Sequence, residues 1–207
     1  LGIGDPNLGT NQQVSTQQVA ERIDKLSKIL SRGAFIINTN EIKNIYGPVE
    51  GSAEEIKTVA NYLKPLSSMI LLQDDANENN IKEMDMNQFK IIHFATHGEV
   101  SGALEGLNEP FLVLTPPDIG NEKNDGLLTM TEIMALSTNA DLVVLSACNT
   151  AAGDMPGSEG FSGLAKSFFI SGSKSILVSN WYVETYSAQE LVINLFKNIK
   201  EYPELSL

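Results

Sequence analysis

The chain has 207 residues, of which 42% are apolar, and this is enough for the core of one domain, since domains typically span ~100 to 200 residues. Its 14 basic and 26 acidic residues give a net charge of −12, which argues against binding to a nucleic-acid backbone or an anionic membrane surface. The single cysteine, Cys148, excludes an internal disulfide framework and a multi-cysteine metal site, and favours a reducing, cytoplasmic compartment.

Short apolar runs alternate with longer stretches of helical period, which predicts an α/β fold around a largely parallel sheet. The chain begins without Met and stops just after a predicted helix, so we expect a fragment of a longer chain. In chain order, we expect strands at 1–5, 67–73, 89–100, 109–117, 140–151 and 174–181, of which 67–73 and 140–151 are buried. We expect helices at 12–32, 54–64, 77–86, 127–136, 160–172 and 184–200, of which 12–32 lies on the surface. The acidic segment 74–80 is expected to be a solvated loop rather than a cation site.

Two residues that could carry out catalysis lie at the ends of the two predicted strands with the clearest apolar runs. Ligands of an open α/β sheet lie beyond the carboxyl ends of its strands, and His97 and Cys148 stand there, 51 residues apart (148 − 97). If the two strands are neighbours, the imidazole can take the thiol proton, and the resulting thiolate can attack an acyl carbon. A cysteine at a strand end is otherwise a small buried apolar residue, so both interpretations stay open at this point.

The other polar residues near these strands have structural interpretations. His93 lies deeper in the apolar run, and we expect a hydrogen-bonded core histidine. It is no zinc partner for His97, because residues four apart in a strand are ~13 Å apart. Ser146 shares the strand face of Cys148 and could tune the thiol, whereas Asn149 is structural.

The glycine-rich segment 153–163 is a weak candidate for a nucleotide cradle. It lacks the G-x-G-x-x-G and G-K-S/T patterns, and Asp154 and Glu159 would repel a phosphate. The chain also lacks a G-x-S-x-G motif, so the sequence gives no support for a serine hydrolase.

Several motifs in order resemble the CHAT domain, a family of caspase-like cysteine peptidases related to separase. The H-G and S-A-C pieces, the E-G-x-x-G-L-A helix and the strand that ends in Trp are specific together. The matching stretches are GIGDP, GPVEGSAEEI, FKIIHFATHGEV, DGLLTMTEI, ADLVVLSACNTAAGD, GSEGFSGLAKSFFISGSKSILVSNWYV and the closing helix.

The resemblance implies a caspase-hemoglobinase-like three-layer sandwich, with a mostly parallel central sheet and helices on both faces. It implies one domain over residues 1–207, in which 10–45 is a variable insertion or connection. It also implies that His97 is the general base and acid and Cys148 the nucleophile of a dyad. By position, the backbone N–H groups of Gly98 and Cys148 would hold the oxyanion.

Relatives such as separase cut after a basic residue, using an acid just after the strand that follows the nucleophile. Glu184 stands at that position, but Thr185 occupies the next one, where a second acid is common. Asp154 is a second candidate, and both acids could instead be solvated loop carboxylates. Trp181 would line the cleft, or end a buried strand. An excess of acids around these residues favours a cationic peptide.

We therefore expect a cytoplasmic cysteine endopeptidase that cleaves a protein or peptide after a basic residue, through a thioester at Cys148. The resemblance implies no metal and no organic cofactor, and a regulatory repeat or sensor module in the full-length chain. One alternative is a catalytically inactive caspase-like scaffold or signalling module. A nucleotide-binding α/β domain is a third interpretation, against which the acidic glycine-rich segment argues.

Overall fold

The central feature of the structure is a five-stranded sheet whose strands all run parallel, in the order β2-β1-β3-β7-β8. The structure is a computed structural model that describes residues 1–9, 39–104, 107–121, 123–146, 160–178 and 184–202. The sheet confirms the predicted α/β class. Its strands are β1 (Gly2–Pro6), β2 (Ile70–Gln73), β3 (Ile91–Ala95), β7 (Leu142–Leu145) and β8 (Ile176–Val178).

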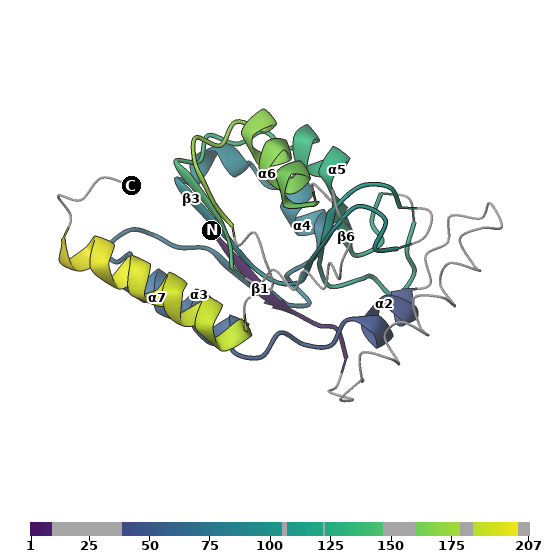
Figure 1. The fold of residues 1–207 in the computed structure, drawn as a ribbon, viewed down its shortest axis with the longest axis horizontal. Helices are drawn as coiled ribbons and strands as arrows, with labels where there is room; N and C mark the ends of the chain where they lie inside the picture. The colour runs from purple at the N-terminus through teal and green to yellow at the C-terminus, as the bar shows by residue number, and fades with distance from the viewer. Residues whose placement is uncertain (10–38, 105–106, 122, 147–159, 179–183, 203–207) are drawn as a thin grey trace.

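Helices cover both faces of this sheet, as predicted for a three-layer sandwich (Figure 1). On one face α3 (Ser52–Tyr62) and α7 (Thr185–Glu201) lie side by side. On the other face lie α4 (Glu78–Glu83), α5 (Met130–Ala135) and α6 (Gly160–Ile170), together with a 3-10 turn at Met86–Gln88. Among the described helices, none is both long enough and apolar enough to cross a bilayer.

A smaller antiparallel sheet in the order β4-β5-β6 adjoins the central one. Its strands are β4 (Gly98–Glu99), β5 (Phe111–Val113) and β6 (Leu127–Thr129). The short helix α2 (Thr39–Ile45) packs against this sheet in an apolar cluster that includes Ile42 and Phe111. The chain just after α2 is therefore anchored beside the small sheet.

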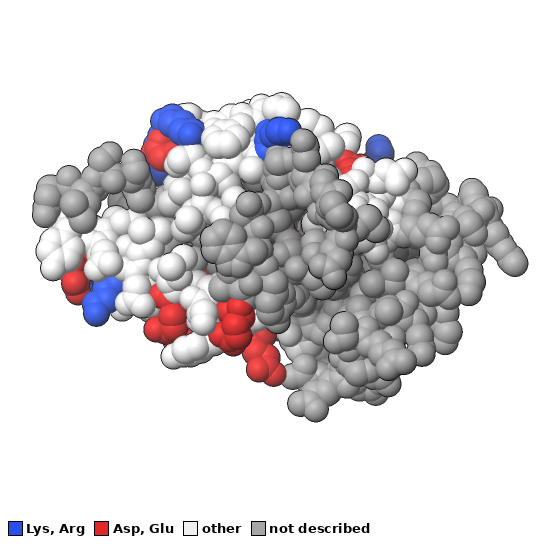
Figure 2. Space-filling view, viewed as in Figure 1, with Lys and Arg blue, Asp and Glu red and all other residues white. Residues whose placement is uncertain are grey.

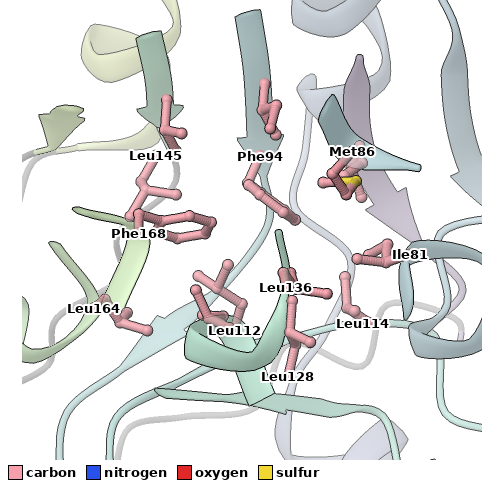
Figure 3. Packing of buried hydrophobic residues seen from close by; sticks show 14 of the residues in the cluster. Ile81, Met86, Phe94, Leu112, Leu114, Leu128, Leu136, Leu145, Leu164 and Phe168 are labelled. Atoms are coloured by element: carbon pink, nitrogen blue, oxygen red, sulfur yellow. The ribbon is translucent and has the colours of Figure 1, made fainter. Parts of the chain in front are cut away.

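The inner strands β3 and β7 of the central sheet are buried on both faces, because alternate side chains point into different helical layers. In β7, Val143 and Leu145 belong to the cluster with α4, α5 and α6, whereas Val144 belongs to the cluster with α3 and α7. In Figure 3, Phe94, Leu145 and Phe168 converge, and the two phenyl rings lie 5.6 Å apart at 47°. Each such buried side chain contributes about 1.5 to 3 kcal/mol.

Local sequence explains where α5 begins and where α6 ends. Thr129 caps α5 and forms a capping box with Glu132, so that both backbone and side chain fix the first turn. After α6, Gly172 has φ +114, and a Cβ there would lie 2.1 Å from the carbonyl oxygen of Thr138. This position therefore requires glycine, as expected for a helix C-terminus.

Three sequence predictions were wrong in detail. The strand at 67–73 is not buried, because β2 is an edge strand and Ile70 is 36% exposed. The run 89–100 is not one strand, because it divides into β3 and β4, which belong to different sheets. The segment 127–136 begins as strand β6 before it turns into α5.

Some predictions lie outside the described residues. These are the helix at 12–32, the ends of the strands at 140–151 and 174–181, and most of the variable connection at 10–45, of which residues 39–45 form α2.

Candidate active site

The two strands expected to carry the chemistry, β3 and β7, are neighbours. They pair in parallel from Ile91 with Leu142 to Phe94 with Leu145. Parallel neighbours end at the same edge of a sheet, so the chain after β3 and the chain after β7 leave from one edge. His97 follows β3 by two residues, and Ser146 follows β7 directly.

His97 lies where the chain passes from the central sheet to the small sheet. The Thr96 hydroxyl donates to the carbonyl oxygen of Val113, and the Val113 amide donates to the carbonyl oxygen of His97 at 2.9 Å. These bonds bind the residues after β3 to β5 instead of continuing the central sheet. His97 is thereby held at the junction of the two sheets.

The loop between α2 and α3 holds the imidazole of His97. Its Nε2 lies 2.7 Å from the carbonyl oxygen of Gly47. A carbonyl oxygen only accepts hydrogen bonds, so Nε2 carries the hydrogen and Nδ1 is the basic nitrogen in the neutral ring. The ring of the buried Tyr46 lies 5.6 Å away at 42°.

Burial lowers the pKa of His97 below its ordinary value of 6.5, and the bond to Gly47 offsets part of this effect. The ring is therefore neutral at pH 7, with one nitrogen oriented by a main-chain acceptor. A neutral imidazole with an unprotonated Nδ1 is the form that a general base requires.

The amide of Gly98 is not used in the ladder with β5. Gly98 pairs with Leu112, and the flanking bond from the Val113 amide to the His97 carbonyl makes this a non-hydrogen-bonded pair. The Gly98 N–H is thus directed away from β5. A backbone donor next to His97 that is directed away from β5 fits the chemistry expected of an oxyanion-binding group.

A half-buried carboxylate, Glu99, lies two residues beyond His97. Burial raises the pKa of Glu99 to about 7. Burial, and then the charge of Glu99, raise the pKa of the Tyr46 phenol above its ordinary value. Within the described ranges, Glu99 forms neither a side-chain hydrogen bond nor an ion pair. Tyr46 thus packs near the imidazole and is influenced by the charge of a carboxylate whose pKa is near neutral.

His93 is a hydrogen-bonded core histidine, as predicted. Its side chain is 2% exposed, and its Nε2 lies 2.9 Å from Oε1 of Glu55 and 3.1 Å from Oγ of Ser146. The sequence did not identify Glu55 or the Gly47 carbonyl as partners of the two histidines. The only sequence signal for Glu55 was the acidic start of α3.

Glu184, a predicted specificity residue, is exposed and caps α7. Its carboxylate accepts hydrogen bonds from the amides of Tyr186 and Ser187 and from the Ser187 hydroxyl, at 2.9 to 3.2 Å. These bonds lower the pKa of Glu184.

The other predicted site residues, Cys148, Asp154 and Trp181, lie outside the described residues. Within the described part of the chain, no His, Asp and Glu side chains gather in a group that could hold a metal ion.

The family model of the CHAT domain matches residues 4–206, which is nearly the whole chain. No curated protein matches this chain.

Proposed function

Because this chain belongs to the CHAT domain family, which is related to the caspase-like cysteine peptidases, we propose that it is a cysteine endopeptidase. In this proposal His97 is the general base and acid, and Cys148 is the nucleophile. The substrate is a protein or peptide, and the bond cleaved follows a basic residue.

The adjacent ends of β3 and β7 give this proposal its strongest support. His97 follows β3, and Cys148 follows the last residue of β7, Leu145, by three positions in the sequence. The bond from His97 Nε2 to the Gly47 carbonyl fixes one tautomer and leaves Nδ1 as a proton acceptor. A base with a fixed tautomer beside the strand that leads to a thiol is the arrangement that a Cys–His dyad requires.

The proposed reaction has two halves. Nδ1 of His97 takes the proton of the Cys148 thiol, and the thiolate attacks the scissile carbonyl carbon, while the amides of Gly98 and Cys148 hold the oxyanion. The C–N bond breaks, His97 gives its proton to the leaving amine, and a thioester remains. A water that gives a proton to His97 then hydrolyses the thioester and restores the thiol.

Charge supports the preference for a basic residue. The chain carries a net charge of −12, and Figure 2 shows acidic side chains near the N-terminal end of α7, whereas an acidic and a basic side chain lie together at the other end. Glu184 and Glu190 belong to this end of α7. Since the Glu184 carboxylate already caps the helix, its part in specificity is through the local negative field rather than through a free carboxylate.

The test uses fluorogenic peptides that differ only in the residue before the scissile bond, namely Arg, Lys, Ala or Asp. We expect cleavage after Arg and Lys, and a loss of at least about 1,000-fold in kcat/KM for Cys148→Ala. The chain has one cysteine, so an Arg-terminated thiol-reactive peptide probe must label the wild type and leave Cys148→Ala unlabelled.

Cleavage that persists in purified Cys148→Ala would overturn the nucleophile assignment. A thiol that reacts with the probe no faster than free cysteine would instead favour the inactive scaffold. Equal rates for Arg, Ala and Asp peptides would contradict the preference for a basic residue but not the assignment of the Cys–His dyad.

A further inference from the structure

A buried polar network links one helix and two strands beneath the edge where β3 and β7 end. It consists of Glu55 on α3, His93 on β3 and Ser146 after β7, whose exposed fractions are 1%, 2% and 5%. His93 Nε2 lies 2.9 Å from Glu55 Oε1 and 3.1 Å from Ser146 Oγ. We call these three residues the Glu55 network.

The Glu55 network places polar side chains in the core, where unpaired polar atoms lower the stability of the fold. Within the described structure, Glu55 Oε2 and His93 Nδ1 are buried without a hydrogen-bond partner. A buried polar group left unpaired is destabilising, and well-packed apolar side chains of similar volume are often as stable or more so. The network therefore fits a role in fixing one geometry better than a role in adding stability.

The location of the Glu55 network connects it to both halves of the proposed dyad. On one side, Ser146 follows the last residue of β7, the strand that precedes Cys148 in the sequence, and its amide donates to the carbonyl oxygen of Phe94 at 3.1 Å. Ser146 thus ties the end of β7 to β3 through its main chain and through His93.

On the other side, Glu55 anchors the beginning of α3, which follows the Gly47 loop closely. The turn between them is closed by a hydrogen bond, because the buried Ser52 hydroxyl donates to the carbonyl oxygen of Val49 at 2.8 Å. Gln189 of α7 also donates to the carbonyl oxygen of Glu50 at 2.6 Å. Holding Glu55 against His93 therefore holds the loop whose carbonyl orients His97.

We propose that Glu55, His93 and Ser146 are positioning residues, which hold the Gly47 carbonyl against His97 and hold the end of β7 beside β3. They touch no substrate and transfer no proton in the reaction. The catalytic consequence rests on the proposed function, whereas the effect on the orientation of His97 does not.

The first experiment reads the orientation of His97 directly. The chain has only two histidines, so ¹⁵N-labelled histidine gives two imidazoles, and long-range ¹H–¹⁵N correlation reports the tautomer of each. In the wild type we expect the Nε2–H tautomer for His97. In Glu55→Leu we expect a mixture of tautomers at His97, because α3 is no longer tied to β3 and the Gly47 carbonyl is displaced.

Glu55→Gln keeps an oxygen acceptor for His93 and should retain the single tautomer. If Glu55→Leu folds and His97 keeps the wild-type tautomer, the positioning role is wrong, whether or not the protein cleaves peptides. If Glu55→Leu does not fold, Ser146→Ala decides by hydrogen exchange at the amide of residue 146.

Ser146→Ala has a matched control in Ser173→Ala. Ser173 is 6% exposed and also makes a buried hydroxyl contact, 3.2 Å from Thr138 Oγ1, but it lies at the amino end of the strands. We expect exchange of the amide of residue 146 to be about 10-fold or more faster in Ser146→Ala and unchanged in Ser173→Ala. Equal exchange in the two variants would overturn the proposal.

The activity measurement adds the catalytic consequence. A base or nucleophile displaced by ~1 Å loses up to ~100-fold in rate. We therefore expect kcat to fall about 10- to 100-fold in Ser146→Ala and Glu55→Leu, with KM little changed, and no such fall in Ser173→Ala or Glu55→Gln. If the wild type cleaves no peptide, the proposed function fails while the tautomer and exchange measurements still decide the positioning role.

Discussion

The surroundings of His93 and His97 differ sharply although the two residues are four positions apart. His93 lies inside β3, is 2% exposed, and is held by the side chains of Glu55 and Ser146. His97 lies beyond the strand, is half-buried, and is held through Nε2 by the main-chain carbonyl of Gly47.

This difference assigns different roles to the two imidazoles. A ring enclosed between a carboxylate, a hydroxyl and the Phe196 ring, whose centroid is 6.3 Å away, has no room for substrate. A ring at the edge of the sheet, oriented through one nitrogen, keeps the other for chemistry. Exposure and the type of partner therefore distinguish a structural from a chemical histidine where sequence spacing does not.

The largest expected effect separates the two roles completely. His97→Ala should lower kcat/KM by about 1,000-fold or more, because the general base is lost, while the free energy of unfolding changes little. His93→Ala should lower the free energy of unfolding by about 3 to 5 kcal/mol, because Glu55 is left buried without its partner. Chemical denaturation and peptide cleavage measured on both variants test this.

Activity retained in His97→Ala would contradict the catalytic role of His97. A His93→Ala variant as stable as the wild type would contradict the structural role of His93. The double variant His93→Leu with Glu55→Leu is the matched control, because it removes both polar partners. Its free energy of unfolding should exceed that of His93→Ala, since no carboxylate is left unpaired.

The next effect concerns the carboxylate near His97. Burial raises the pKa of Glu99 from its ordinary 4.5 to about 7, so the folded state retains a proton that the unfolded state has released. The stability that this protonated group contributes is complete below pH ~4.5 and is lost as the pH rises through about 7. Glu99→Gln should therefore be more stable than the wild type at pH 8 by about 1 to 3 kcal/mol, and equal to it near pH 4.5.

Urea denaturation at a series of pH values measures this effect. Asp125, whose pKa burial and the charge of Glu78 also raise to about 7, provides a comparison outside the histidine site. Asp125→Asn should show the same sign, and the two substitutions should add. A Glu99→Gln curve parallel to that of the wild type at all pH values would show that Glu99 ionises as it does in the unfolded chain.

The sequence predicted the strands that matter, because β3 and β7 are buried on both faces and appear as continuous apolar runs. It missed the break after Ala95, because the polar residues that follow, Thr96 to Glu99, also fit the polar end of one continuous strand. The bonds of Thr96 and His97 to Val113 cause the break and have no sequence signature. For the same reason a carbonyl acceptor such as that of Gly47 is invisible in the sequence.

Glu55 was missed for a different reason. In the sequence it belongs to an acidic helix start, which is usually solvated, and its partner His93 is 38 residues away. Only the packing of α3 on the sheet brings the two together and buries them. Partner identity at long sequence separation is thus set by tertiary packing, which leaves no local signal in the sequence.

The smallest expected effect tests how burial tunes His97. A general base works in its neutral form, and burial lowers the pKa of His97 below 6.5, so the acid limb of the kcat/KM profile should lie below pH 6.5. Tyr46→Leu admits water to the imidazole and should move this limb up toward 6.5. Tyr46→Phe keeps the ring and should leave the limb in place.

The profile is best measured in a Glu99→Gln background, because Glu99 titrates near pH 7 and its charge acts on Tyr46. Tyr62→Leu is the control, because Tyr62 lies on α3, where Lys200 covers its ring at 5.7 Å, and not beside His97. If the acid limb stays in place when Tyr46 becomes Leu, the imidazole is shielded by the Gly47 loop rather than by the Tyr46 ring. An acid limb above pH 6.5 in the wild type would contradict neutral, half-buried His97 as the base, because activity would then be lost while the ring is still unprotonated.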